Sequence, residues 1–354
     1  MHEHDRIPSS ALLSRTVSLV GVGTFLLLTG CDDNVSGSGG SGTATTTAAT
    51  GSTTTATASS ASGGGCTAAC CPKAECVTAD PDCIALTDNA GQTKFGLRVA
   101  QLDLTKPVAL SSGIVAATIA SNILLDDATC NLTGSGSFSW LLQFDTAAGT
   151  LKTGGAKPVN DPKAGYAFDD EMVTQGGHSF HVQPVTFTGV TPDAGGKFAV
   201  MSGADLVLPI FLDATGTQVV LLPITGARFS MGALSANQNC IGHYNAAGLD
   251  PDAICIGDAS HPTFLAGGAV EGLVILEEAD SVIVAALQQS LCTLLTGDAS
   301  TYGTKGGDGI TRCKRDANGV IIYQGDTCSM AGQSCKDAVT VDGAFAASAV
   351  KITN

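Results

Sequence analysis

Cysteine is the residue that most constrains the fold of this chain, because paired sulfur atoms fix distant segments against one another. The chain of 354 residues contains 13 cysteines, and 12 remain once Cys31 is set apart. An even number can be oxidised completely within one chain, which would leave Cys31 as the unpaired residue. The predicted disulfide cysteines are Cys66, Cys70, Cys71, Cys76, Cys83, Cys130, Cys240, Cys255, Cys292, Cys313, Cys328 and Cys335.

Five of these cysteines lie within residues 66–83. Zinc and iron–sulfur sites favour pairs with two residues between them, and this spacing is missing here, so disulfides are favoured over a metal site. Because five is odd, at least one member must pair with a cysteine of the following body. For the body itself, proximity in the sequence predicts the bridges Cys240–Cys255 and Cys313–Cys328.

The first 30 residues have the pattern of an export signal. Arg6 and Arg15 precede an apolar run from Val17 to Leu28, which is shorter than the about 20 residues that span a bilayer and fits the apolar region of a signal peptide. Leu28-Thr29-Gly30-Cys31 follows, and this motif resembles the lipobox of bacterial lipoproteins. The resemblance implies cleavage before Cys31 and lipidation of its thiol. The alternatives are an uncleaved anchor and a cysteine that occurs by chance in a shortened helix.

The same resemblance predicts a location in the bacterial cell envelope. A lipid anchor at Cys31 would hold the chain on a membrane, with the rest of the protein facing the periplasm or the cell exterior. More than one acyl chain makes such an anchor durable, since each buried CH₂ contributes about 0.8 kcal/mol. Asp32 resembles an inner-membrane retention signal of enteric bacteria, but the choice of membrane stays open.

Residues 31–65 are predicted to be the lipidated cysteine followed by a disordered linker. From Asn34 to Gly65 the chain has no charged and no aromatic residue, so it cannot bury enough apolar surface to offset its ordering entropy. A Gly/Ser-rich chain of this length spans about 30 Å. The linker would separate the anchor from a Cys-rich segment, residues 66–83, and a body, residues 84–354.

The body is predicted to be mainly β, a sandwich or barrel-like fold with one packed helix. Apolar residues alternate with others over residues 138–144, the period of a half-buried strand. Residues 94–104 alternate in the same way, with a change of phase that predicts a bulge near Ala100. Apolar residues at helical spacing, an acidic start and Gly297 predict the helix at about residues 277–296. Residues 114–125 fit a helix or a strand.

The clearest hairpin covers residues 205–226. Asp213-Ala214-Thr215-Gly216 has turn chemistry, and Pro209 and Pro223 flank Gly216 at equal distances, which predicts edge or bulge positions. Both faces of this hairpin are apolar. It is therefore either a strand pair buried between two layers or the wall of a cavity for an apolar ligand. A second hairpin is expected to turn at residues 316–319.

The charge of the chain narrows the possible partners. A formal net charge of −15 repels phosphate backbones and argues against nucleic-acid binding. The carboxylate pairs of Asp80-Pro81-Asp82 and Asp250-Pro251-Asp252 lack the remaining ligands of an EF-hand, so turns are expected there rather than calcium sites.

The most site-like cluster comprises Asp169, Asp170, Glu171, His178 and His181. Such residues bind zinc or a similar metal when they converge. However, residues three apart in a strand point to opposite faces, so an acidic loop with surface histidines is the expected structure. No GxSxG, HExxH or P-loop motif occurs, and the sequence predicts no catalytic, cofactor-binding or metal site.

These patterns lead to one main hypothesis for the function. The chain is expected to be a lipid-anchored envelope protein whose non-catalytic β body binds or organises an unknown ligand or protein outside the cell membrane. One alternative is a hydrolase or metal-dependent enzyme that uses Asp169, Asp170, His178 and His181. Another is a carrier of an apolar ligand.

Overall fold

The computed structural model describes residues 69–71, 79–127, 130, 132–258 and 260–353. The chain divides into two units, Met1–Ala58 and Ser59–Asn354, and all described residues belong to the second. The predictions for the export signal, Cys31, the linker, Cys66 and Cys76 therefore lie outside the described residues.

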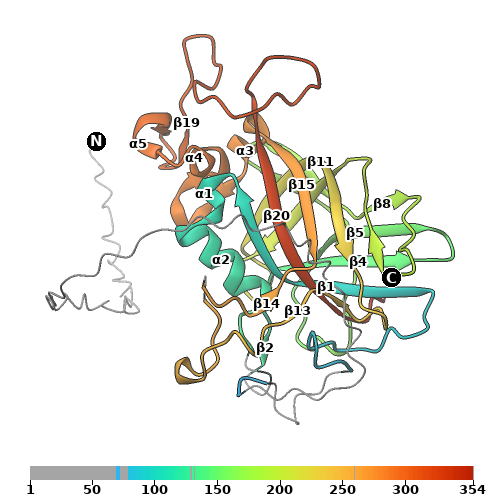
Figure 1. The fold of residues 1–354 in the computed structure, drawn as a ribbon. Helices are drawn as coiled ribbons and strands as arrows, with labels where there is room; N and C mark the ends of the chain where they lie inside the picture. Colours follow the sequence, from blue (N-terminus) through green and yellow to red (C-terminus); the bar gives the residue numbers. More distant parts are fainter. Residues whose placement is uncertain (1–68, 72–78, 128–129, 131, 259, 354) are drawn as a thin grey trace, which may run out of the picture. The chain divides into compact units, whose positions relative to one another are not determined.

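The body is built on a 10-stranded antiparallel sheet (Figure 1), which confirms the mainly β prediction. Its main path is, in order, β10 (Ala204–Phe211), β11 (Val219–Ala233), β15 (Gly268–Ile275), β20 (Ala338–Ala349), β1 (Lys94–Lys106), β4 (Ser139–Asp145), β5 (Thr150–Ala156) and β8 (Val185–Thr188). Off this path, β9 (Lys197–Phe198) pairs with β11, and β12 (Cys240–Ile241) pairs with β20.

The sheet curls into a half-barrel, so that strands from its two ends pack against each other. β10 begins the path and β5 lies near its other end, yet a Cβ added to Gly155 of β5 would lie 2.3 Å from Cδ of Pro209 in β10. Glycine at 155 is therefore needed for this close approach. The enclosed core includes Trp140, whose ring centroid lies 6.0 Å from that of Phe229 and 6.4 Å from that of Phe345.

Shorter elements surround the main sheet. The small strand pairs are β2 (Asp126–Asp127) with β3 (Leu132–Thr133), β6 (Glu171–Gln175) with β7 (His178–Val182), and β13 (His243–Tyr244) with β14 (Phe264–Leu265). A separate four-stranded sheet contains β16 (Ile283–Val284), β17 (Gln289–Ser290), β19 (Thr311–Cys313) and β18 (Gly303–Lys305). The helices are α1 (Val108–Ser111), α2 (Gly113–Ile123), α3 (Leu276–Ser281), α4 (Leu291–Leu295) and α5 (Ala299–Tyr302), with 3-10 turns η2 (Pro251–Ala253) and η3 (Ala285–Leu287).

The predicted bulge in the first long strand is confirmed, since the pairing of β1 with β20 shifts register between Val99 and Gln101. The half-buried character expected for residues 138–144 is wrong, because every residue from Ser139 to Phe144 is buried. One face of β4 meets the main core, and on the other face Leu141 packs with Tyr166 and Val350.

The face of the sheet on which Leu141 packs with Tyr166 also buries Arg98 of β1. Its Nε donates to Ser139 Oγ at 2.9 Å and its Nη2 donates to the carbonyl of Phe138 at 2.8 Å. Its guanidinium carbon lies 5.7 Å from the ring centroid of Tyr166. Burial lowers the pKa of Arg98. The alternation of apolar and other residues in β1 therefore does not mean that one face of the strand is exposed to solvent.

The predicted helix at about residues 277–296 is divided in two by the hairpin β16–η3–β17. The helix α3 ends at Ser281, and α4 begins at Leu291. Three β-branched residues in succession, Val282, Ile283 and Val284, favour extended backbone, and Gln288 has a positive φ of 50° that a helix excludes. Residues 114–125, which fitted either state, form α2 and the residues after it.

The two predicted turns are confirmed. β10 and β11 form the hairpin around Asp213, whose carboxylate accepts from the backbone N–H groups of Thr215 and Gln218. Pro209 lies in the edge strand, and Pro223 precedes the first residue of β11 that pairs with β15. In the turn at 316–319, the N–H of Asp316 donates to the carbonyl of Val320 at 2.8 Å, and only an isolated bridge follows within this described segment.

Disulfides connect the Cys-rich segment to the body. The bridges are Cys70–Cys255, Cys83–Cys240, Cys292–Cys313 and Cys328–Cys335. Cys71 and Cys130 are also disulfide-bonded. The expected attachment of the Cys-rich segment is confirmed for Cys70 and Cys83, and disulfides of this kind indicate an oxidising, extracytoplasmic compartment.

The predicted bridges Cys240–Cys255 and Cys313–Cys328 are wrong. Cys240 lies in β12 beside the end of β20, and the chain after Cys83 reaches the same place, where the Leu86 N–H donates to the carbonyl of Ala349 at 2.8 Å. Tertiary pairing along β20 therefore decides the partner of Cys240. Within the part of the chain that the structure describes, no helix is long and apolar enough to cross a bilayer.

Candidate functional site

An apolar cavity of about 140 Å³ lies between the β10–β11 hairpin, the helices α1 and α2, and the segment from β16 to α4. Figure 1 shows α1, α2 and α4 close together beside β1. The lining residues are Leu104, Leu110, Val115, Thr118, Ile119, Ile210, Leu212, Val220, Leu221, Leu222, Val284, Ala286, Leu287, Leu291 and Leu294. All except Thr118 are aliphatic, and none is charged.

The cavity has a buried floor and a more exposed rim. On the floor, Leu221 is fully buried and Leu104, Ile210 and Leu291 are less than a tenth exposed. At the rim, Val115, Leu212, Val220 and Leu287 are half-buried and Ala286 is exposed. Aliphatic side chains thus continue from the core to the surface, which gives an apolar molecule a path to the floor.

Local sequence explains how each wall forms. The β10–β11 hairpin has apolar residues on both faces, so one face joins the core while residues near its turn also reach the cavity. In α2, Val115 and Ile119 are four residues apart and therefore lie on one face of the helix. The wall from Val284 to Leu294 exists because the predicted long helix is interrupted there.

The geometry favours the binding of a small apolar molecule. An engineered apolar cavity of about 150 Å³ in another protein stays dry and binds benzene, and the present cavity is of similar size. It is smaller than the roughly 300–1,000 Å³ of sites for drug-sized ligands. Its capacity therefore corresponds to a small hydrocarbon or to the end of one acyl chain.

The acidic and histidine cluster of the sequence is only partly brought together. The Nε2 of His181 lies 2.9 Å from Oδ1 of Asp170, with both side chains exposed. His178 instead packs its ring on Phe180, with centroids 4.5 Å apart. These histidines pair with different residues of β6, Gln175 and Met172, so they do not converge on one point.

Asp169 lies in a different environment. It is buried, its Oδ2 has no hydrogen-bond partner among the described residues, and burial raises the pKa of this carboxyl. Lys157 lies 3.7 Å from Asp169 and 2.7 Å from Glu171. The lysine thus joins these two carboxylates, while Asp170 contacts His181.

Two other groups of metal-ligating residue types lie close together in the described segments. One comprises Asp280, Cys292 and Cys313, and the other comprises Cys328, Cys335 and Asp337. In both groups the sulfur atoms belong to disulfides. Asp280 accepts from Ser290 Oγ at 2.8 Å and from the Cys313 N–H at 2.7 Å, so its role here is to hold the chain around α3 and α4 together.

The two carboxylate pairs weighed for calcium are in turns. Asp80 accepts from the N–H of Asp82 at 2.9 Å and from the amide of Asn237 at 2.6 Å. Asp250 accepts from the N–H of Asp252 at 2.9 Å. The bonds to Asp82 and Asp252 are typical of Asx turns, and the bond from Asn237 links the first turn to a distant loop.

The sequence indicated one wall of the cavity and missed the others. The doubly apolar hairpin pointed to Ile210 and its neighbours, whereas α2 and the segment from Val284 to Leu294 were not connected with it. The available signal was the helical spacing of Val115 and Ile119. Comparisons with protein-family models, curated proteins and solved structures found no match to this chain.

Proposed function

We propose that this chain is a lipid-anchored protein of the bacterial cell envelope whose β body binds a small apolar ligand, such as the end of one acyl chain, without catalysing a reaction. The cavity with its aliphatic floor and rim is the observation that carries the proposal. The lipobox-like motif at Cys31 supports the anchor, and the disulfides are consistent with a location outside the cytosol.

The proposal has a simple energetic basis. Each methylene that moves from water into the cavity contributes about 0.8 kcal/mol, and the aliphatic lining offers no competing polar group beyond Thr118. Part of this gain is offset by the lost freedom of the bound ligand. Affinity should therefore rise with the length of an alkyl chain until the cavity is full.

A series of neutral alcohols tests this expectation by calorimetry on the purified protein. From 1-butanol to 1-pentanol and 1-hexanol, we expect the dissociation constant to fall about fourfold for each added methylene. Neutral probes keep charge interactions out of the comparison. An affinity that does not depend on chain length would contradict the proposal.

Two adjacent alanines provide a matched pair of variants for the same titration. Ala285 and Ala286 are both exposed in η3, and only Ala286 is among the cavity-lining residues. Ala286→Trp should fill the rim and weaken 1-hexanol binding by at least about tenfold, or ~1.4 kcal/mol. Ala285→Trp should leave it unchanged. Equal affinities in the two variants would place the alcohol elsewhere.

The hydrolase or metal-dependent alternative would need Asp169, Asp170, His178 and His181 to act on one substrate atom. Asp170 contacts His181, whereas His178 packs on Phe180 and Asp169 is held near Lys157. No contact in the described residues joins the four, so we do not propose catalysis there.

A further inference from the structure

A second cleft, of about 400 Å³, lies where the loop before β1 meets the carboxyl-terminal segment. Its lining residues are Thr87, Asn89, Gln92, Lys94, Phe95, Gly96, Gln143, Val350, Lys351, Ile352 and Thr353. This cleft differs in character from the apolar cavity, because amides, hydroxyls and ammonium groups dominate its lining. We refer to it as the lysine cleft.

The carboxyl-terminal segment forms one side of the lysine cleft by crossing β1 at Gly96. A Cβ added to Gly96 would lie 2.6 Å from Cγ1 of Ile352 and 2.8 Å from the carbonyl oxygen of Val350. The Val350 N–H donates to the Gly96 carbonyl at 3.1 Å. Glycine at this position therefore allows the segment to lie directly on the strand, with a polar hollow beside it.

Gln143 adds an amide without a protein partner to the lysine cleft. It pairs with Gly96 across β1 and β4, the residue is only 8% exposed, and its amide makes no hydrogen bond to a described residue. By contrast, the Asn89 amide in the same cleft already donates to the carbonyls of Gly96 and Gln238. Gln143 therefore retains one donor group and one acceptor for a ligand.

The charge of the lysine cleft is opposite to that of the protein. The chain has 32 acidic and 17 basic residues, yet the lining contains Lys94 and Lys351 and no carboxylate. Neither lysine forms an ion pair within the described part of the chain. Two cations without partners beside an open polar amide favour an anionic ligand.

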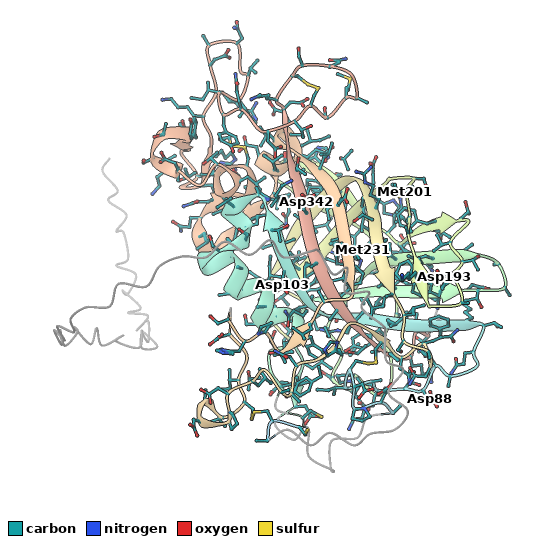
Figure 2. All side chains as sticks on the ribbon, in the orientation of Figure 1. Asp88, Asp103, Asp193, Met201, Met231 and Asp342 are labelled. Carbon is teal, nitrogen blue, oxygen red and sulfur yellow. A yellow bond between two sulfur atoms is a disulfide. The ribbon has the colours of Figure 1, made fainter. Side chains whose placement is uncertain are left out.

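Nearby carboxylates are already engaged in turns. Asp88, which Figure 2 labels at the lower right of the body, accepts from the Ala90 N–H at 3.0 Å. Asp145 is the cross-strand neighbour of Lys94 and accepts from the Ala148 N–H at 2.9 Å. Neither carboxylate forms an ion pair with Lys94 or Lys351, so both lysines remain available to a ligand.

We propose that the lysine cleft binds a small polyhydroxylated anion of the sugar-acid class. The ammonium groups of Lys94 and Lys351 would hold the carboxylate, since lysine acts as a compact positive charge. The Gln143 amide and the Thr87 hydroxyl supply donors and acceptors for ligand hydroxyls. Ile352, which is half-buried, forms an apolar side for the C–H face of a sugar ring.

Calorimetric titration of the full chain with D-glucuronate tests the proposal, with D-glucose as the neutral counterpart. We expect saturable binding of D-glucuronate and about four- to 25-fold weaker binding of D-glucose, because each of the two lysines contributes about two- to fivefold through an exposed ion pair. Lys94→Gln and Lys351→Gln should each weaken glucuronate binding about two- to fivefold. Gln143→Leu should weaken both sugars, since the amide serves their hydroxyls.

Lys197→Gln is the matched control, because Lys197 is also exposed but does not line the lysine cleft. It should leave the affinity unchanged. Absence of saturable glucuronate binding, equal affinity for the two sugars, or equal effects of the Lys94, Lys351 and Lys197 substitutions would each overturn the assignment. These probes are hydrophilic, so the result is independent of ligand binding in the apolar cavity.

Discussion

Replacing Cys70, Cys83, Cys240 and Cys255 together by alanine should lower the free energy of unfolding by more than about 5 kcal/mol. The outer bridge, Cys70–Cys255, spans 185 residues, and loop-closure entropy for such a span is about 5 kcal/mol. The inner bridge, Cys83–Cys240, spans 157 residues within this loop. Once the outer bridge is closed, the inner bridge restrains only the remaining 28 residues, 185 minus 157, which contributes about 3–4 kcal/mol. Globular proteins have about 5–15 kcal/mol in total, so most of the variant should be unfolded.

Denaturant unfolding followed by circular dichroism measures this loss. The matched control replaces Cys328 and Cys335, which are seven residues apart, and the same entropy argument gives about 2 kcal/mol. If the four-cysteine variant loses no more stability than this control, the nested bridges do not constrain the unfolded chain as we describe.

Trp140→Ala should cost about 3–5 kcal/mol of unfolding free energy, the range for deleting a large buried aromatic side chain. Trp140 is 1% exposed and packs with the rings of Phe229 and Phe345 in one aromatic cluster. Its Nε1–H donates to Thr153 Oγ1 at 2.7 Å. The substitution therefore leaves a cavity in the centre of the half-barrel and removes the partner of a buried hydroxyl.

Two control variants separate these contributions. Trp140→Phe keeps a ring in the core and should cost less than Trp140→Ala. Met172→Ala removes a side chain that is 60% exposed and should change stability by no more than about 0.5 kcal/mol. Circular dichroism is the suitable probe, because Trp140 is the only tryptophan. A loss below about 1 kcal/mol for Trp140→Ala would contradict the central packing role.

Features that depend on neighbouring residues were predictable from the sequence. The turns at 213–216 and 316–319 follow from Asp and Gly side-chain chemistry, and the bulge after Val99 follows from a change in the apolar phase. The helical spacing of apolar residues wrongly predicted one helix at residues 277–296. The β-branched run from Val282 to Val284 and the buried contacts of Asp280 divide this segment into two helices.

The disulfide pairs could not be predicted from the spacing of the cysteines, because they depend on which distant segments lie beside β20. Residues 83–86 and β12 both lie along the end of β20, and this tertiary arrangement joins Cys83 to Cys240. The burial of Gln143 has the same origin. In the sequence it is a polar residue between Leu142 and Phe144, which predicts a solvent-facing side chain, but the carboxyl-terminal segment covers that face.

The candidate sites, too, were predictable only where neighbouring residues determine them. The apolar faces of the β10–β11 hairpin indicated one wall of the cavity, whereas the walls from α2 and α4 arise only when distant segments pack together. His178 and His181 looked promising because they are close in the sequence. Their places on β7 separate them, as expected for residues three apart in a strand.

The most direct test of the proposed function compares the mass of the full-length protein, extracted from its native membrane, under denaturing and native conditions. Denaturing conditions report covalent lipid at Cys31, and native conditions add any ligand held without a covalent bond. Our account predicts an additional apolar mass that is not detergent in the wild type and in Ala285→Trp, and its loss in Ala286→Trp. Identical native and denaturing masses in the wild type would contradict it.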